Sequence, residues 1–156
     1  MSGLKRILCL GNPYIETDRA GPLVFEHLTA QRLPDSLEIV DGGLAGLDLL
    51  RFFAGCQALV LVDSLLEQPL VPGGLVLLSR QEAAELATET FGHGAGLPYL
   101  LKMLPAALEE TIPEVTVLGL QPPFSRTRIE AAVRCCFELL AVQPAAIPEG
   151  ERISGR

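Results

Sequence analysis

The chain is short of positive charge and has no long apolar run. Twelve Lys and Arg residues stand against 19 Asp and Glu residues, for a formal net charge of -7. This acidity disfavours binding to nucleic acid or to an anionic membrane face. The longest apolar runs, such as residues 58–62, are far too short to span a bilayer. Lys5 and Arg6 precede only four apolar residues, which predicts no secretory signal peptide and a cytoplasmic protein.

Several motifs of known site chemistry are also missing. The four cysteines form no C-x-x-C pair, which favours buried free thiols over a zinc or redox site; they are Cys9, Cys56, Cys135 and Cys136. The segment Gly11-Asn12-Pro13 lacks the spacing of a dinucleotide fingerprint, and Pro13 removes a backbone N–H that a phosphate would need. Neither a G-x-x-x-x-G-K-S/T loop nor a G-x-S-x-G nucleophile elbow is present.

What the sequence does contain is an alternation of short apolar stretches and amphipathic ones. With 156 residues, 49% of them hydrophobic, it is long enough for one domain with a sizeable core. The apolar runs predict strands over 7–10, 37–40, 58–62, 75–78 and 115–118. The periodic stretches predict helices over 21–31, 47–54, 81–86, 97–108 and 128–142.

This alternation predicts an α/β fold. We expect a single three-layer domain over residues 1–143, with a mostly parallel sheet of about five strands and helices on both faces. Residues 144–156 lack helical periodicity and carry two prolines, so we expect a mobile C-terminal tail there.

Three acidic residues follow or end the first three predicted strands: Asp18, Asp41 and Asp63. If these strands are parallel, the three carboxylates meet at one edge of the sheet, where open α/β proteins place their sites. Each alone has an ordinary explanation as a helix cap or a turn former. Asp63 is the hardest to explain in this way, because it ends the most apolar strand, where an unpaired charge is costly.

The sequence has only two histidines. His27 lies on the first predicted helix, where a solvated or half-buried position is expected. His93 lies between Gly92 and Gly94, so its backbone can approach a site closely. Two carboxylates and an imidazole match the ligand preferences of nickel, zinc, iron or manganese.

Five blocks of the sequence, in order, resemble those of the hydrogenase maturation endopeptidases. These blocks are LCLGNPYIETDRAGPLVFEHL, VDGGLAGLDLL, LVLVDSL, HGAGL and LGLQP, and the resemblance runs from about Arg6 to Val142. It implies a phosphorylase/hydrolase-like fold and makes Asp18, Asp63 and His93 the catalytic and nickel-contacting residues. Two positions depart from the usual pattern: Thr17 replaces a common acid, which leaves Glu16 as a substitute, and Leu44 replaces a threonine.

The resemblance implies a nickel-dependent endopeptidase, grouped with the aspartic-type peptidases. Its substrate would be the precursor of a nickel–iron hydrogenase large subunit, from which it removes a C-terminal extension. Nickel would arrive with that precursor, so the resting enzyme needs none, and the sequence does not choose between a metal-activated water and a carboxylate general base. Two alternatives stay open: a non-catalytic metal- or peptide-binding chaperone of maturation on the same fold, and a small nucleotide-binding protein, which the missing phosphate loop disfavours.

Overall fold

A computed structural model describes residues 3–44, 46–91, 96–108 and 111–143. Its strands are β1 (Lys5–Leu10), β2 (Leu37–Gly43), β3 (Ala58–Ser64), β4 (Leu75–Ser79) and β5 (Glu114–Leu120). The α-helices are α1 (Ala20–Thr29), α2 (Arg80–Ala84), α3 (Leu97–Ala107) and α4 (Arg126–Leu140). The 3-10 helices are η1 (Glu16–Asp18), η2 (Leu47–Phe53), η3 (Pro72–Gly74) and η4 (Thr88–Phe91). The expected tail over 144–156 lies outside the described residues.

The five strands form one sheet in the order β2-β1-β3-β5-β4. The first four are parallel to one another, and β4 runs antiparallel beside β5 at one edge. The prediction of a mostly parallel sheet of about five strands is therefore confirmed. The inner strands β1 and β3 are almost wholly buried, as their continuous apolar runs require when both faces of the sheet are covered.

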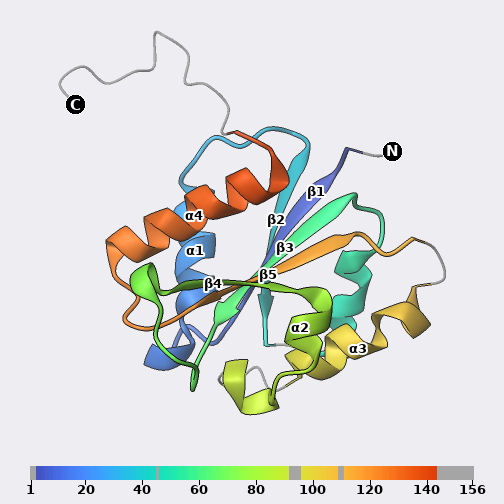
Figure 1. Ribbon diagram of the computed structural model, residues 1–156. Helices are drawn as coiled ribbons and strands as arrows, with labels where there is room; N and C mark the ends of the chain where they lie inside the picture. The colour runs from blue at the N-terminus through green and yellow to red at the C-terminus, as the bar shows by residue number, and fades with distance from the viewer. Residues whose placement is uncertain (1–2, 45, 92–95, 109–110, 144–156) are drawn as a thin grey trace, which may run out of the picture.

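Helices cover the two faces of the sheet and give the three expected layers (Figure 1). On one face α1 and α4 pack on alternate residues of β1 and β3, including Ile7, Cys9, Val60 and Val62. On the other face η2, α2 and α3 pack on the intervening residues, including Leu8, Leu10 and Leu61. In the described part of the chain, no helix has both the length and the apolar composition needed to cross a membrane.

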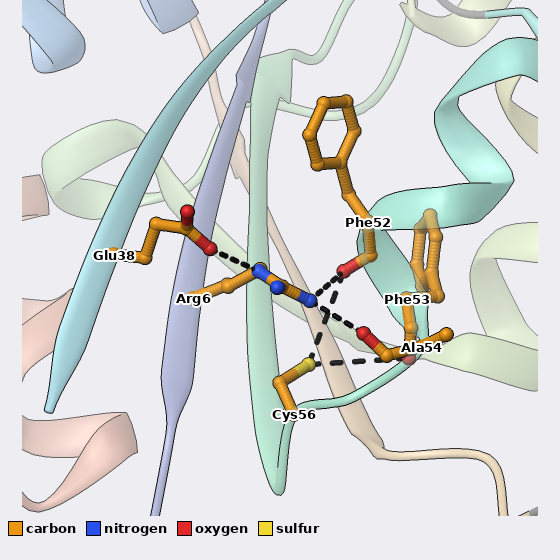
Figure 2. Close-up of polar contacts among 6 residues, drawn as sticks. All are labelled: Arg6, Glu38, Phe52, Phe53, Ala54 and Cys56. Atoms are coloured by element: carbon orange, nitrogen blue, oxygen red, sulfur yellow. Dashed lines mark hydrogen bonds and ion pairs between the residues drawn. The ribbon is translucent and has the colours of Figure 1, made fainter.

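A polar cluster around Arg6 lies at the amino-terminal ends of β1 and β2 (Figure 2). The Arg6 guanidinium pairs with Glu38 and donates hydrogen bonds to the carbonyl oxygens of Phe52 at 2.9 Å and Ala54 at 2.6 Å. The Cys56 thiol donates to the carbonyl of Phe52 across 3.9 Å. These contacts satisfy the last carbonyls of η2, which no further helical turn satisfies. The helix expected over 47–54 is present as a 3-10 helix and not as an α-helix.

The first helix begins directly against the end of β1. A Cβ atom on Gly21 would lie 2.0 Å from the carbonyl oxygen of Leu10, so only glycine permits this approach. Because α1 starts so close to β1, the connecting residues 11–19 are held over the carboxyl edge of the sheet. That connection carries η1, which ends at Asp18.

Candidate active site

Asp63 is the second-to-last residue of β3, and its side chain is fully buried. Its Oδ1 atom accepts a hydrogen bond from the Ser64 backbone N–H at 2.8 Å. Its Oδ2 atom is also buried and has no hydrogen-bond partner among the described residues. A carboxylate oxygen left in this state costs free energy unless a proton or a cation reaches it.

Asp18 ends η1 and is only 1% exposed. Its Oδ2 atom accepts a hydrogen bond from the Asn12 backbone N–H at 3.0 Å, and its own N–H donates to the carbonyl of Ile15 at 2.9 Å. The turn closes tightly, because a Cβ atom on Gly11 would lie 2.3 Å from the Asp18 carbonyl oxygen, and Gly11 has φ +145°. The Gly-Asn-Pro segment therefore serves to orient the Asp18 carboxylate, rather than to bind a phosphate.

The structure brings Asp18 and Asp63 together. The segment η1 packs against β3, and the Ala20 N–H at the start of α1 donates to the Ser64 Oγ atom at 3.2 Å. Burial raises the pKa of the Asp63 carboxyl well above its usual range, and the negative charge of Asp18 raises it further. The hydrogen bond from Ser64 opposes this rise. Two buried acids that repel each other in this way are typical of functional sites.

Asp41 does not join this pair. It lies within β2 opposite Cys9 of β1, and Cys9 in turn lies opposite Val62 of β3. Residues at one register position point to the same face of a sheet, so Asp63, one residue further along, faces the opposite side. Asp41 is exposed, and its Oδ1 atom accepts from the Gly43 N–H at 3.3 Å. The expected crowding of three acids is therefore wrong for Asp41, whose carboxylate instead accepts a hydrogen bond from the local backbone of β2.

His93 lies outside the described residues, but the chain on either side of it is anchored. Phe91 and Leu97 are fully buried in the same core cluster. The carbonyl of Thr90 accepts a hydrogen bond at 2.6 Å from the N–H of Leu66, three residues beyond Asp63. Residues 3–44, 46–91, 96–108 and 111–143 alone contain no group of three or more His, Cys, Asp or Glu side chains that could hold a metal ion.

His27, Cys9 and Cys136 take the positions expected of them, whereas Cys56 and Cys135 are half-buried and not buried. His27 is half-buried on α1, away from the acidic pair. All four cysteines are free thiols, with Cys9 and Cys136 buried in the core. Burial raises the pKa of both of these thiols, so a reactive thiolate is disfavoured at either position.

The sequence had shown Gln121 only as part of the LGLQP block, and its role emerges from the structure. Its side chain is 2% exposed and lies between the two sides of the loop that follows β3. The Nε2 atom donates to the Pro69 carbonyl at 2.8 Å, and the Oε1 atom accepts from the Val71 N–H at 3.0 Å. Gln121 thereby fixes the backbone beside the site, a role for which a Gln before two prolines offers no local signal.

Comparison with known proteins identifies the family of this chain. The hydrogenase maturation protease family model matches residues 22–134 of the chain. The chain belongs to the hydrogenase maturation protease family. Asp63 and His93 fall within the matched segment, and Asp18 lies four residues before it.

Relatives within the family agree in sequence. The chain is 32% identical to the hydrogenase 2 maturation protease of Escherichia coli over 63% of its own length and 61% of that protein. The hydrogenase 3 maturation protease of Escherichia coli is 31% identical over 74% of this chain and 71% of the relative. The first alignment thus spans less than two thirds of the relative.

Solved structures of family members agree in fold. The hydrogenase maturating endopeptidase HybD from Escherichia coli superposes with a TM-score of 0.76 and 25% identity, over 96% of this chain and 99% of HybD. An endopeptidase from Escherichia coli solved in solution gives a TM-score of 0.74 and 28% identity, over 94% of this chain and 99% of that one. The predicted α/β architecture of a maturation endopeptidase is confirmed.

Proposed function

We propose that this protein is an endopeptidase that removes a C-terminal extension from the precursor of a nickel–iron hydrogenase large subunit. Membership of a family named for hydrogenase maturation proteases supports the reaction class. The observation that carries the assignment to a site is the buried pair of Asp18 and Asp63 at the carboxyl edge of the sheet. Open α/β folds place their catalytic sites at this edge.

The acidic pair suits a nickel ion that arrives with the precursor as part of the substrate. The Oδ2 atom of Asp63 is buried and has no hydrogen-bond partner among the described residues, so a cation there would relieve an unfavourable state. Carboxylate and imidazole ligands are accepted by nickel, and His93 supplies the imidazole in this proposal. Nickel bound there would act as a Lewis acid toward the scissile carbonyl or a water.

The protein's own residues hold the charges and protons of this site. Asp18 stays oriented through its Oδ2 atom, which accepts from the Asn12 N–H. Asp63 is oriented through its Oδ1 atom, so a proton on this carboxyl resides on Oδ2. Its raised pKa means that Asp63 retains this proton to a higher pH than an exposed acid does, and it gives the proton up when a cation approaches.

Binding to the site is therefore linked to the metal content of the precursor. A precursor without nickel offers no cation to the two carboxylates, and the pair then repels additional negative charge. Cleavage in this scheme follows correct loading of the metal. The four free thiols agree with action in the reducing cytoplasm, where large-subunit precursors would be met.

The test is a cleavage reaction on two forms of the same precursor. Purified large-subunit precursor from the host organism is incubated with the protein, once loaded with nickel and once without it, and its mass is followed. We expect a loss of mass at the C-terminus in the nickel-loaded form alone. Unchanged mass in both forms would contradict the proposal, and binding without cleavage would indicate the non-catalytic chaperone instead.

A further inference from the structure

Ser64 is the last residue of β3 and directly follows Asp63. It is fully buried, although its side chain is polar. Its backbone N–H donates to the Asp63 Oδ1 atom at 2.8 Å, and its Oγ atom accepts from the Ala20 N–H at 3.2 Å. Ala20 lies two residues after Asp18. Ser64 therefore connects the strand that carries one acid of the pair to the segment that carries the other.

The Ser64 Oγ atom satisfies the start of a helix that belongs to another part of the chain. Ala20 is the first residue of α1, and the N–H groups of a first helical turn have no acceptor inside the helix. Within the described chain, Arg19 at the N-cap position provides no side-chain cap. Ala20 is fully buried, so its N–H is shielded from water. The Ser64 hydroxyl is thus the acceptor that lets α1 begin in a buried place.

The side chains of Ser64 and Asp63 leave β3 on opposite faces of the sheet, because the two residues are consecutive in the strand. Ser64 shares its face with Val60 and Val62, which α1 and α4 cover. The Ser64 hydroxyl therefore does not lie on the side of the Asp63 carboxylate. It acts on the site through the elements that it joins, and not as a reacting group.

Asp18 is fixed to the other side of the sheet by a separate set of contacts. Its Oδ2 atom accepts from the Asn12 N–H at 3.0 Å, and the neighbouring Gly11 N–H donates to the Gly43 carbonyl of β2 at 2.8 Å. These contacts hold Asp18 relative to β1 and β2, whereas Asp63 belongs to β3. The Ala20–Ser64 hydrogen bond ties the connection after β1 to β3. A cation shared by two carboxylates needs their spacing fixed to within about 0.5 Å.

We infer that Ser64 is a positioning residue that sets the spacing of the Asp18 and Asp63 carboxylates. This inference rests on the proposed function, in which both carboxylates meet the nickel of the precursor. An alanine at this position keeps the backbone N–H that orients Asp63, but it leaves the buried Ala20 N–H without its acceptor. The start of α1 then shifts to bring this N–H to water, and Asp18 moves with it.

Cadmium binding by the free protein tests this role without the precursor. Isothermal calorimetry with Cd²⁺ should give an affinity about tenfold weaker for Ser64→Ala than for the wild type, because misplaced carboxylates share an ion less well. The matched control is Ser125→Ala, which removes a hydroxyl that caps α4 by accepting from the Arg128 N–H, also at 3.2 Å. Both variants should melt about 2–4 °C below the wild type, but Ser125→Ala should keep the wild-type affinity.

A second variant, Ser64→Thr, keeps the hydroxyl and should bind Cd²⁺ within about threefold of the wild type. Wild-type affinity in Ser64→Ala would overturn the inference. Equal losses of affinity in Ser64→Ala and Ser125→Ala would also overturn it, since the loss of any helix cap would then explain both. An equal loss in Ser64→Thr and Ser64→Ala would show that the hydroxyl does not set the spacing.

Cleavage of the nickel-loaded precursor gives an independent readout. For Ser64→Ala, kcat should fall about tenfold while KM changes by less than about threefold, because misplacement affects the chemical step and the rest of the precursor still binds. A wild-type kcat in Ser64→Ala would contradict the inference alone. Failure of the wild-type protein to bind Cd²⁺ and to cleave the precursor would instead contradict the proposed function, so the two failures are distinguishable.

Discussion

At the residue scale, the defining feature is a carboxyl group that is stable only when a proton or a cation accompanies it. Asp63 is fully buried at the end of an apolar strand, beside the negative charge of Asp18. One of its oxygens has a hydrogen bond, and the other has none among the residues that the structure describes. A protein optimised for stability alone would place an apolar or amide side chain there.

The first prediction follows from the raised pKa of Asp63. At pH values above about 4, which is the pKa of the Asp63 carboxyl in the unfolded chain, the folded state binds more protons than the unfolded state. The free energy of unfolding should therefore fall as pH rises from about 4 toward the raised pKa. Asp63→Asn should lack this fall and be more stable at about pH 8, by about 1–3 kcal/mol. Urea unfolding at a series of pH values measures both effects.

The control for this measurement is Asp35→Asn, which changes an exposed acid in the same way. Its unfolding free energy should follow that of the wild type at every pH. An equally steep fall in Asp63→Asn would mean that other groups cause the pH dependence. It would also remove the energetic argument for a cation at this carboxyl.

The second prediction concerns His93. If this side chain completes the site, His93→Ala should bind Ni²⁺ or Cd²⁺ more weakly than the wild type, because one of three ligands is lost. Isothermal calorimetry of the free protein with each ion measures the affinity. The matched control is His27→Ala, which removes a half-buried histidine on α1 and should bind the ions as the wild type does. Equal affinity in wild type and His93→Ala would exclude His93 from the site.

At the scale of elements, the site depends on how the connections after β1 and β3 are fixed. The connection after β1 is short and tight, since α1 begins against the Leu10 carbonyl and the turn at Gly11 closes on Asp18. The connection after β3 is longer and is held by Gln121 from the end of β5. Buried groups of neighbouring elements thus order each loop that borders the acidic pair.

The third prediction tests the longer of these loops. Gln121→Ala leaves the Pro69 carbonyl and the Val71 N–H without their partner, which should lower the free energy of unfolding by about 1–3 kcal/mol. The measurement is a chemical denaturation curve. Gln57→Ala makes the same change at an exposed position of the chain and should shift the curve by less than about 0.5 kcal/mol. Equal shifts in the two variants would contradict the structural role of Gln121.

The local pattern of the sequence predicts the elements well where apolar runs decide them. Strands β1 and β3 follow from continuous apolar stretches, and α1 and α4 follow from their periodicity. The antiparallel direction of β4 depends on its pairing with β5, which no local pattern encodes. The carbonyls at the end of η2 likewise bond to Arg6, more than 40 residues away in the chain, which no local pattern shows.

The same distinction between local pattern and distant contacts applies to the residues of the site. Asp18 and Asp63 were predictable, because Asp63 is an acid at the end of a buried strand and Asp18 is an acid just before the helix that follows another buried strand. Asp41 satisfied the same rule and yet faces the other side of the sheet, since a shift of one residue reverses the direction of a side chain. Gln121 was not predictable in its role, because its partners lie about 50 residues away.

At the scale of the whole molecule, the two edges of the sheet have different roles. The amino edge carries the Arg6 cluster, whose hydrogen bonds tie η2 to β1 and β2 (Figure 2). The carboxyl edge carries the acidic pair. The helices cover both faces of the sheet, and the loops that follow the parallel strands lie at their carboxyl ends (Figure 1). This division follows from the parallel arrangement of four strands.

The most direct test of the account is processing of nickel-loaded precursor by Asp18→Asn, beside wild type and His27→Ala. Asparagine keeps an oxygen that can accept from the Asn12 N–H, so the melting temperature should stay close to that of the wild type or rise slightly. The substitution removes the anionic oxygen, and cleavage followed by mass should be abolished. His27→Ala should process normally. Full cleavage by Asp18→Asn would contradict the account and would reduce Asp18 to an anchor for the Gly-Asn-Pro turn.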